Sequence, residues 1–192
     1  MIVRRERPAD HAAVGSLHMA AFARDPATGA VRAADDVPEA RLVEQLRNDP
    51  GFLPHLSLVA VDGGDVDGGD VDGGGVDGGG VAGHVIATRG WLEPFGTAVL
   101  GLGPLAVRPD RQGHGIGTVL VHALVAVAEA AGERLVALLG SPDYYRRFGF
   151  VPADIFGVSA PDPRWARHFQ ARLLDGPALQ GTFRYADPFT RL

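Results

Sequence analysis

The sequence contains no cysteine and no lysine. Without cysteine the chain can form neither a disulfide nor a thiolate metal site, and it cannot use a cysteine nucleophile. This composition fits a cytoplasmic protein, and we expect one. All 18 basic residues are arginines, which excludes a phosphate-binding loop of the Walker type, because that loop requires a lysine.

Long apolar segments and basic stripes are also missing. No run approaches the ~18 apolar residues of a membrane-spanning helix, and no apolar segment follows the charges of residues 1–5, so we expect no signal peptide. The net charge is −5, but six of the 23 acidic residues lie within residues 62–80. The rest of the chain is therefore close to neutral, and we expect neither a nucleic acid nor a membrane as partner.

Hydrophobic periodicity predicts one mixed α/β domain over residues 1–192, a length sufficient for one substantial core. Apolar positions at helical spacing predict helices over residues 8–23, 38–48, 118–131 and 142–148. Strands are predicted over residues 2–5, 56–61, 81–87, 99–107, 134–139, 168–173 and 181–185.

Residues 62–80 form a low-complexity repeat of Val, Asp and Gly with a five-residue period. Removing three units would leave two strands joined by an Asp-Gly turn, so we interpret the segment as an expanded hairpin loop. Calcium binding is the alternative, since Asp-Gly repeats can supply oxygen ligands. However, no acidic residue closes an EF-hand register, and the period differs from the nine residues of calcium-binding β-rolls. We expect no metal site.

A glycine-rich turn, Gln112-Gly113-His114-Gly115-Ile116-Gly117-Thr118, joins the strand at 99–107 to the following helix. Glycines let the backbone approach a ligand, and a helix N-terminus offers unpaired N–H groups to an anion. The turn does not match a dinucleotide fingerprint, because Thr118 stands where a third glycine or alanine belongs. A turn without a ligand remains the alternative interpretation.

The turn resembles the Gln/Arg-x-x-Gly-x-Gly/Ala signature of the GNAT acetyltransferases, and residues 145–150 (Tyr-Arg-Arg-Phe-Gly-Phe) resemble the family's Tyr-x-x-x-Gly-Phe motif. Residues 104–109 resemble the family's fourth strand, and residues 39–43, 56–60, 83–85, 101–107 and 181–185 are similar to a bacterial subgroup of predicted N-acetyltransferases. The resemblance implies the GNAT acyl-CoA N-acyltransferase fold, whose central strands splay apart to admit acetyl-CoA.

The resemblance also implies how the cofactor would be held. Main-chain groups of the strand would pair with the pantetheine arm, and the turn would hold the pyrophosphate, with Gln112 capping the turn. Gly101, Gly103 and Pro104 interrupt the strand, which fits a strand that opens to a ligand. The residues expected at the cofactor are Leu105, Ala106, Val107, Gln112, Gly113, His114, Gly115, Ile116, Gly117 and Thr118.

For the chemistry, Tyr145 matches the family's general-acid tyrosine, because a phenol can protonate a leaving thiolate while staying neutral at pH 7. Core packing is the alternative role for Tyr145, and Tyr144 is the better candidate for packing or substrate contact. The strand at 99–107 carries no acidic residue that could serve as a base. Glu93 in the preceding turn and His84 are candidates, and deprotonation by solvent would also suffice.

The resemblance implies transfer of an acetyl group to a primary amine of a small molecule or a peptide. A non-catalytic acyl-CoA-binding or regulatory module with the same fold is the competing interpretation, and a nucleotide-binding α/β protein is a third. The sequence identifies neither the acceptor nor the oligomeric state, and it leaves a homodimer open.

Overall fold

A computed structural model describes residues 1–24, 30–32, 37–62, 80–177 and 179–191. Four α-helices lie in these ranges: α1 (His11–Phe22), α2 (Pro38–Arg47), α3 (Ile116–Ala130) and α4 (Pro142–Tyr145). The strands are β1 (Ile2–Arg5), β2 (Phe52–Val61), β3 (Val81–Glu93), β4 (Thr97–Val107), β5 (Leu135–Leu139), β6 (Val151–Pro152), β7 (Val158–Ser159), β8 (Phe169–Leu173) and β9 (Gly181–Arg184). Among these residues no helix is long and apolar enough to cross a membrane.

The strands form one mixed sheet in the order β1-β2-β3-β4-β5-β8-β6, while β9 pairs with β3 and β7 pairs with β9. The pairs β1–β2, β2–β3 and β3–β4 are antiparallel, whereas the pair β4–β5 is parallel. The β4–β5 pairing covers only Leu100 with Val136 and Gly101 with Ala137. Beyond Gly101 the two strands part, which confirms the predicted α/β class with splayed central strands.

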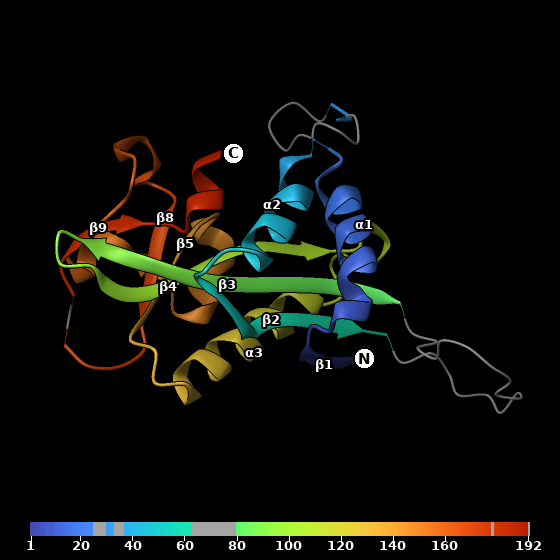
Figure 1. The fold of residues 1–192 in the computed structure, drawn as a ribbon, viewed down its shortest axis with the longest axis horizontal. Helices are drawn as coiled ribbons and strands as arrows, with labels where there is room; N and C mark the ends of the chain where they lie inside the picture. Colours follow the sequence, from blue (N-terminus) through green and yellow to red (C-terminus); the bar gives the residue numbers. More distant parts are fainter. Residues whose placement is uncertain (25–29, 33–36, 63–79, 178, 192) are drawn as a thin grey trace, which may run out of the picture.

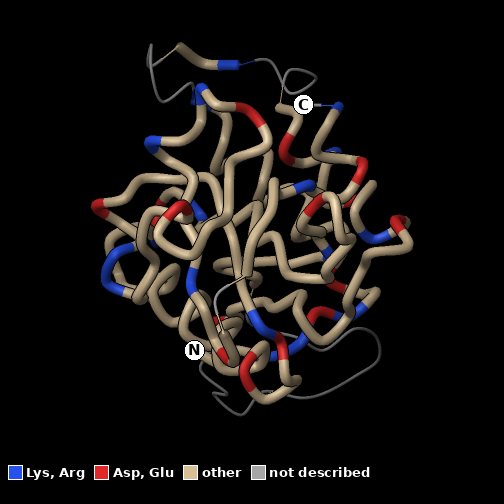
Figure 2. The backbone as a smooth tube through the Cα atoms, turned by 90° about the vertical axis from the view of Figure 1, so that its left-hand side faces the viewer, with Lys and Arg blue, Asp and Glu red and all other residues tan. Residues whose placement is uncertain are grey.

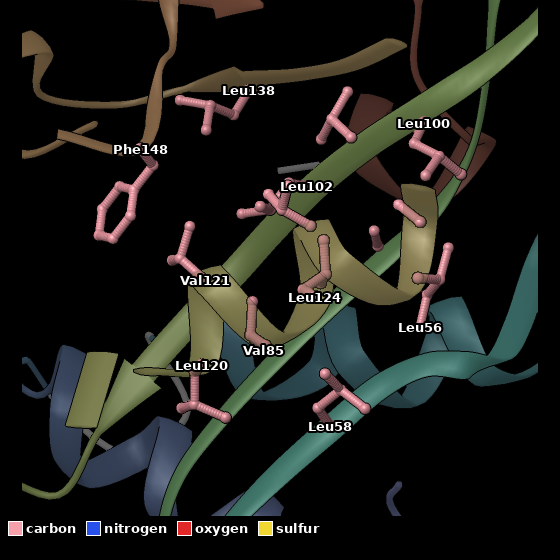
Figure 3. Packing of buried hydrophobic residues seen from close by; sticks show 14 of the residues in the cluster. Leu56, Leu58, Val85, Leu100, Leu102, Leu120, Val121, Leu124, Leu138 and Phe148 are labelled. Atoms are coloured by element: carbon pink, nitrogen blue, oxygen red, sulfur yellow. The ribbon is translucent and has the colours of Figure 1, made fainter. Parts of the chain in front are cut away.

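The main core lies between the sheet and α3. Alternate residues of a strand point to the same face, so Leu56 and Leu58 of β2 face α3 together with Val85 of β3. From α3, buried Leu120 and Leu124 close this layer. Figure 3 shows these side chains meeting between the helix and the strands.

The opposite face of the sheet is covered by α1 and α2, which lie across β3 from α3 (Figure 1). Val59 of β2 packs there with Val14 of α1 and Val43 of α2. Leu42 and Leu46 of α2 pack with Ile86 of β3. Both faces are therefore buried, which explains the nearly continuous apolar sequence of the central strands.

The predicted elements are observed with bounds that differ by up to six residues, since β3 extends to Glu93 and its prediction ends at 87, and β6 and β7 are missed. Each of these strands has two residues, too few to show a periodicity. β2 and β3 pair antiparallel, and the Asp62 amide donates to the Gly80 carbonyl across 3.3 Å. The remainder of the repeat, 63–79, lies outside the described residues. In Figure 2 arginines and acidic residues are interspersed along the backbone.

Candidate active site

The glycine-rich turn leads from the end of β4 into α3. Gly113 and Gly115 have φ angles of 79° and 81°, a left-handed conformation that favours glycine. Gly115 is the residue before the first turn of α3. The Gln112 side chain donates from Nε2 to the Val107 carbonyl at 3.1 Å. This bond ties the turn to the end of β4, in line with the capping role that the resemblance implies for Gln112. A helix N-terminus with unpaired N–H groups lies behind the turn.

At Gly117 a neighbouring side chain, and not the backbone conformation, limits the space for a side chain. A Cβ atom at this position would lie 2.6 Å from the Tyr144 hydroxyl oxygen. Tyr144 therefore packs directly onto the first turn of α3. Burial raises the pKa of Tyr144. Glycine at 117 is thus explained by the tyrosine that covers the turn.

A cavity, here called the turn pocket, opens beside the turn. Two guanidinium groups line it, from Arg111 and Arg147. Arg111 pairs through Nη1 with Asp62 Oδ2 at 2.6 Å, and the Arg147 guanidinium carbon lies 5.1 Å from the centre of the Tyr144 ring. The other lining residues are Leu105, Val107, Gln112, Gly113, Gly115, Ile116, Gly117, Thr118 and Tyr144. Arginines and helix N–H groups together make this pocket suited to phosphate.

A second cavity, here called the apolar pocket, lies where β4 leaves β5. It shares Leu105 with the turn pocket and is otherwise lined by Phe22, Glu39, Leu42, Leu102, Gly103, Pro104, Leu139, Tyr145, Trp165, Tyr185 and Phe189. The edge of β4 that faces away from β3 has no strand partner between Leu102 and Val107 among the described residues. The two pockets therefore meet along a strand edge whose main-chain groups are available to a ligand.

The neighbouring tyrosines of α4 are divided between the two cavities. Tyr144 lines the turn pocket and Tyr145 lines the apolar pocket, with their ring centres 4.9 Å apart. The Tyr145 ring also lies 5.8 Å from that of Phe150. Burial raises the pKa of Tyr145 above the ordinary range of a phenol, and Tyr144 adds to this shift. Tyr145 is therefore a neutral donor at pH 7.

Four candidate residues of the sequence analysis, Ala106, His114, Glu93 and His84, line neither pocket. The Ala106 side chain is buried, and the residue pairs with His84 across the sheet. His114 is exposed, with Nδ1 2.9 Å from the Gln112 carbonyl oxygen. Glu93 ends β3 and pairs with Arg184 Nε at 3.0 Å. The structure thus does not bring Glu93 to Tyr145, because β3 carries it to the opposite end of the β3–β4 hairpin from the glycine turn.

His84, the other candidate base, belongs to a buried polar network. Its Nδ1 lies 2.9 Å from His18 Nε2 and its Nε2 lies 3.0 Å from Ser57 Oγ. Ser57 donates to Glu6 at 2.6 Å, and Arg47 pairs with the same carboxylate. His84 does not line either pocket. Because His18, His84 and Ser57 lie on α1, β3 and β2, their hydrogen bonds connect these three elements.

This network makes stability depend on pH. Burial lowers the pKa of His18 to about 2 and also lowers that of His84. Below pH ~6.5 the unfolded chain binds a proton at His18 and the folded chain does not. The free energy of unfolding should therefore decrease by about 1.4 kcal/mol per pH unit on account of His18 as the pH falls, and the lowered pKa of His84 acts in the same direction. Urea unfolding at pH 7.5, 6.5 and 5.5 measures this dependence.

Two histidine substitutions, His18→Leu and the control His114→Leu, test whether the buried histidine causes this pH dependence. The first should remove about one proton from the pH dependence of unfolding, while the second replaces an exposed histidine and should leave the dependence unchanged. A parent protein equally stable at pH 7.5 and 5.5 would contradict the neutral state of the buried pair.

Some site residues escape the sequence analysis. Arg147 occupies a variable position of the Tyr-x-x-x-Gly-Phe pattern, and Glu39 lies in a helix far from the glycine turn in sequence. Arg147 could have been noticed as a basic residue beside a phosphate motif. Glu39 belongs to residues 39–43, which resemble the bacterial subgroup, but this resemblance gives it no role, because its place in the apolar pocket arises from the packing of α2 against the sheet.

The splayed central strands and this pair of pockets are the arrangement expected of an acyl-CoA N-acyltransferase fold. The family model "Acetyltransferase (GNAT) domain" matches residues 58–152. The chain is 32% identical over 158 residues to "Uncharacterized N-acetyltransferase YjhQ" of Escherichia coli K12, covering 78% of this chain and 79% of that protein. It is 30% identical to "Uncharacterized N-acetyltransferase YhbS" of the same strain, covering 100% and 99%. The chain belongs to the GNAT acetyltransferase family, which confirms the resemblance.

Two similar solved structures contain a ligand. The E. coli GNAT family N-acetyltransferase YhbS in complex with CoA has a TM-score of 0.79 and 28% identity, covering 99% of this chain and 92% of that one. A GNAT family acetyltransferase from Brucella melitensis in complex with acetyl-CoA has a TM-score of 0.72 and 30% identity, covering 98% and 97%.

Proposed function

We propose that this protein is an acetyl-CoA-dependent N-acetyltransferase that acts on a primary amine. The observation that carries the proposal is the junction of the two pockets at Leu105, where β4 parts from β5. A cosubstrate that carries phosphate at one end and a thioester at the other can occupy the turn pocket and reach the apolar pocket along this edge. The family membership and the CoA-bound and acetyl-CoA-bound relatives support the same assignment.

The residues of the turn fit this cosubstrate. Nothing lies within 4 Å of the positions where Cβ atoms of Gly113 and Gly115 would be, so their backbone N–H groups can approach a pyrophosphate closely. Arg111 and Arg147 add positive charge in the same pocket. On β4, main-chain groups of Leu105 and Val107 would pair with the pantetheine arm as an added strand would.

Tyr145 is the proton donor in this proposal. Acetyl-CoA supplies an acetyl thioester, and the neutral amine attacks its carbonyl carbon as the carbon–sulfur bond breaks. Tyr145 holds its proton at neutral pH, since burial raises its pKa, and it donates this proton to the leaving sulfur. The phenolate recovers a proton from the attacking nitrogen, directly or through water. Before this attack, the ammonium form of the acceptor must lose a proton. Neither Glu93 nor His84 lines the pockets, so we propose that solvent accepts this proton.

Calorimetric titration with acetyl-CoA, ATP and NAD, followed by an assay of CoA release with a mixture of amines, tests the proposal. We expect binding of acetyl-CoA alone and release of CoA that depends on amine. Binding of acetyl-CoA without amine-dependent release would favour the non-catalytic acyl-CoA-binding module. Binding of ATP or NAD in place of acetyl-CoA would favour a nucleotide-binding protein.

A further inference from the structure

The apolar pocket carries information about what it binds. Its cavity is about 490 Å³, a size typical of small-molecule sites. Aromatic residues line it from four separate segments, namely Phe22 at the end of α1, Tyr145 of α4, Trp165 before β8, and Tyr185 and Phe189 near the C-terminus. Leu42 and Pro104 add aliphatic surface. Such walls favour a ligand whose body is apolar, since burial of its surface drives binding.

One side chain of the pocket breaks this pattern. Glu39 is the only charged residue among the described residues that line it. Its Oε1 atom lies 3.6 Å from Nη1 of Arg32. Its Oε2 atom is buried and has no hydrogen-bond partner among the described residues. A buried carboxylate oxygen without a donor is unfavourable, because it has lost its hydration and gained nothing in return. A cationic donor from a ligand would satisfy it.

We propose that the apolar pocket binds a small primary amine carried on an apolar body and that the Glu39 carboxylate binds its ammonium group. The inference rests on the acetyl transfer proposed above, because it makes this pocket the acceptor side of the junction at Leu105. An ammonium presents three N–H donors and a charge opposite to that of the carboxylate. Aromatic and aliphatic walls then select the remainder of the molecule.

The test uses three probes that separate charge from apolar surface. 2-Phenylethylamine carries both features, 2-phenylethanol keeps the ring without the charge, and 2-aminoethanol keeps the charge without the ring. Calorimetric titration of each into the unaltered protein, with and without saturating CoA, should show 2-phenylethylamine binding at least about tenfold more tightly than either analogue. This comparison needs no variant and therefore no assumption about folding.

Two substitutions in α2 then test whether the carboxylate of Glu39 binds the ammonium group. Glu39→Gln keeps the shape and removes the negative charge, so it should weaken 2-phenylethylamine binding by about tenfold and leave 2-phenylethanol binding unchanged. Glu44 of α2 is exposed and lies outside both pockets, and Glu44→Gln should bind all three probes like the parent. Equal affinity of Glu39→Gln and parent for 2-phenylethylamine, or equal affinity of the parent for 2-aminoethanol and 2-phenylethylamine, would overturn the inference.

An assay of CoA release with the same probes separates this inference from the proposed function. Release with 2-aminoethanol but not with 2-phenylethylamine would overturn the pocket assignment and leave the acetyltransferase standing. Binding of 2-phenylethylamine that depends on Glu39, without release of CoA for any amine, would uphold the pocket assignment and overturn the acetyltransferase.

Discussion

Tyr145→Phe is expected to lower turnover at least tenfold while acetyl-CoA affinity stays close to that of the parent. The substitution removes one hydroxyl and keeps the ring, so packing against Phe148 and Phe150 is preserved. General acid catalysis contributes typically ~10²–10⁴-fold to a rate, and the loss concerns the transition state only. Single-turnover kinetics at saturating acetyl-CoA measure the chemical step without interference from product release.

Tyr144→Phe is the matched control, because it removes the same group from the adjacent ring. Tyr144 lines the turn pocket, and its hydroxyl oxygen would lie 2.6 Å from a Cβ atom at Gly117, so loss of this hydroxyl should affect acetyl-CoA binding more than the chemical step. A fall in the single-turnover rate for Tyr144→Phe, with Tyr145→Phe unchanged, would transfer the proton-donor role to Tyr144. Unchanged chemistry in both variants would leave solvent as the proton source.

Gly115→Val is expected to weaken acetyl-CoA binding at least tenfold. The φ angle of 81° at this residue belongs to the left-handed region, which a β-branched side chain occupies only with strain. Relief of the strain would turn the N–H groups at the start of α3 away from the phosphate position. A Cβ atom there would also stand in the space that the ligand needs. Calorimetric titration with acetyl-CoA gives the dissociation constant directly.

The same helix supplies a control with equal strain. Gly132 follows the C-terminus of α3 with a φ angle of 73°, and as at Gly115 no atom lies within 4 Å of the position that a Cβ atom would take. Gly132→Val should therefore destabilise the fold to a similar degree in thermal unfolding but leave acetyl-CoA affinity unchanged. Equal affinities of Gly115→Val and the parent would place the phosphate site elsewhere.

Much of the fold and half of the site could be predicted from local sequence. The central strands and α3 are long enough for their periodicity to appear, and Gln112 to Gly117 combine conformational freedom with a helix start in one contiguous stretch. The observed cap by Gln112 and the left-handed Gly113 and Gly115 agree with that prediction. These features depend on neighbours in the chain, so the sequence pattern contains them.

The apolar pocket shows what a local pattern does not contain. Glu93 is an acidic residue shortly before β4 and is a reasonable candidate base by sequence, yet the structure pairs it with Arg184 of β9. Glu39 lies in a segment that resembles the family but is given no role by the sequence, and it lines the apolar pocket. Whether Glu93 or Glu39 reaches the apolar pocket depends on strand pairing and helix packing between residues far apart in the sequence. Neither periodicity nor motif spacing encodes such contacts.

The sequence alone therefore determined the family, the α/β class and the glycine-rich turn before α3, because each depends on residue types at short, regular spacings. Tertiary structure alone decided which tyrosine lines which pocket, that His84 is buried against His18, and that Glu39 lines the same pocket as the edge of β4. These facts arise where α1, α2 and α4 are placed against the splayed strands. Their positions follow from burial of apolar surface contributed by the whole chain, and no single segment specifies them.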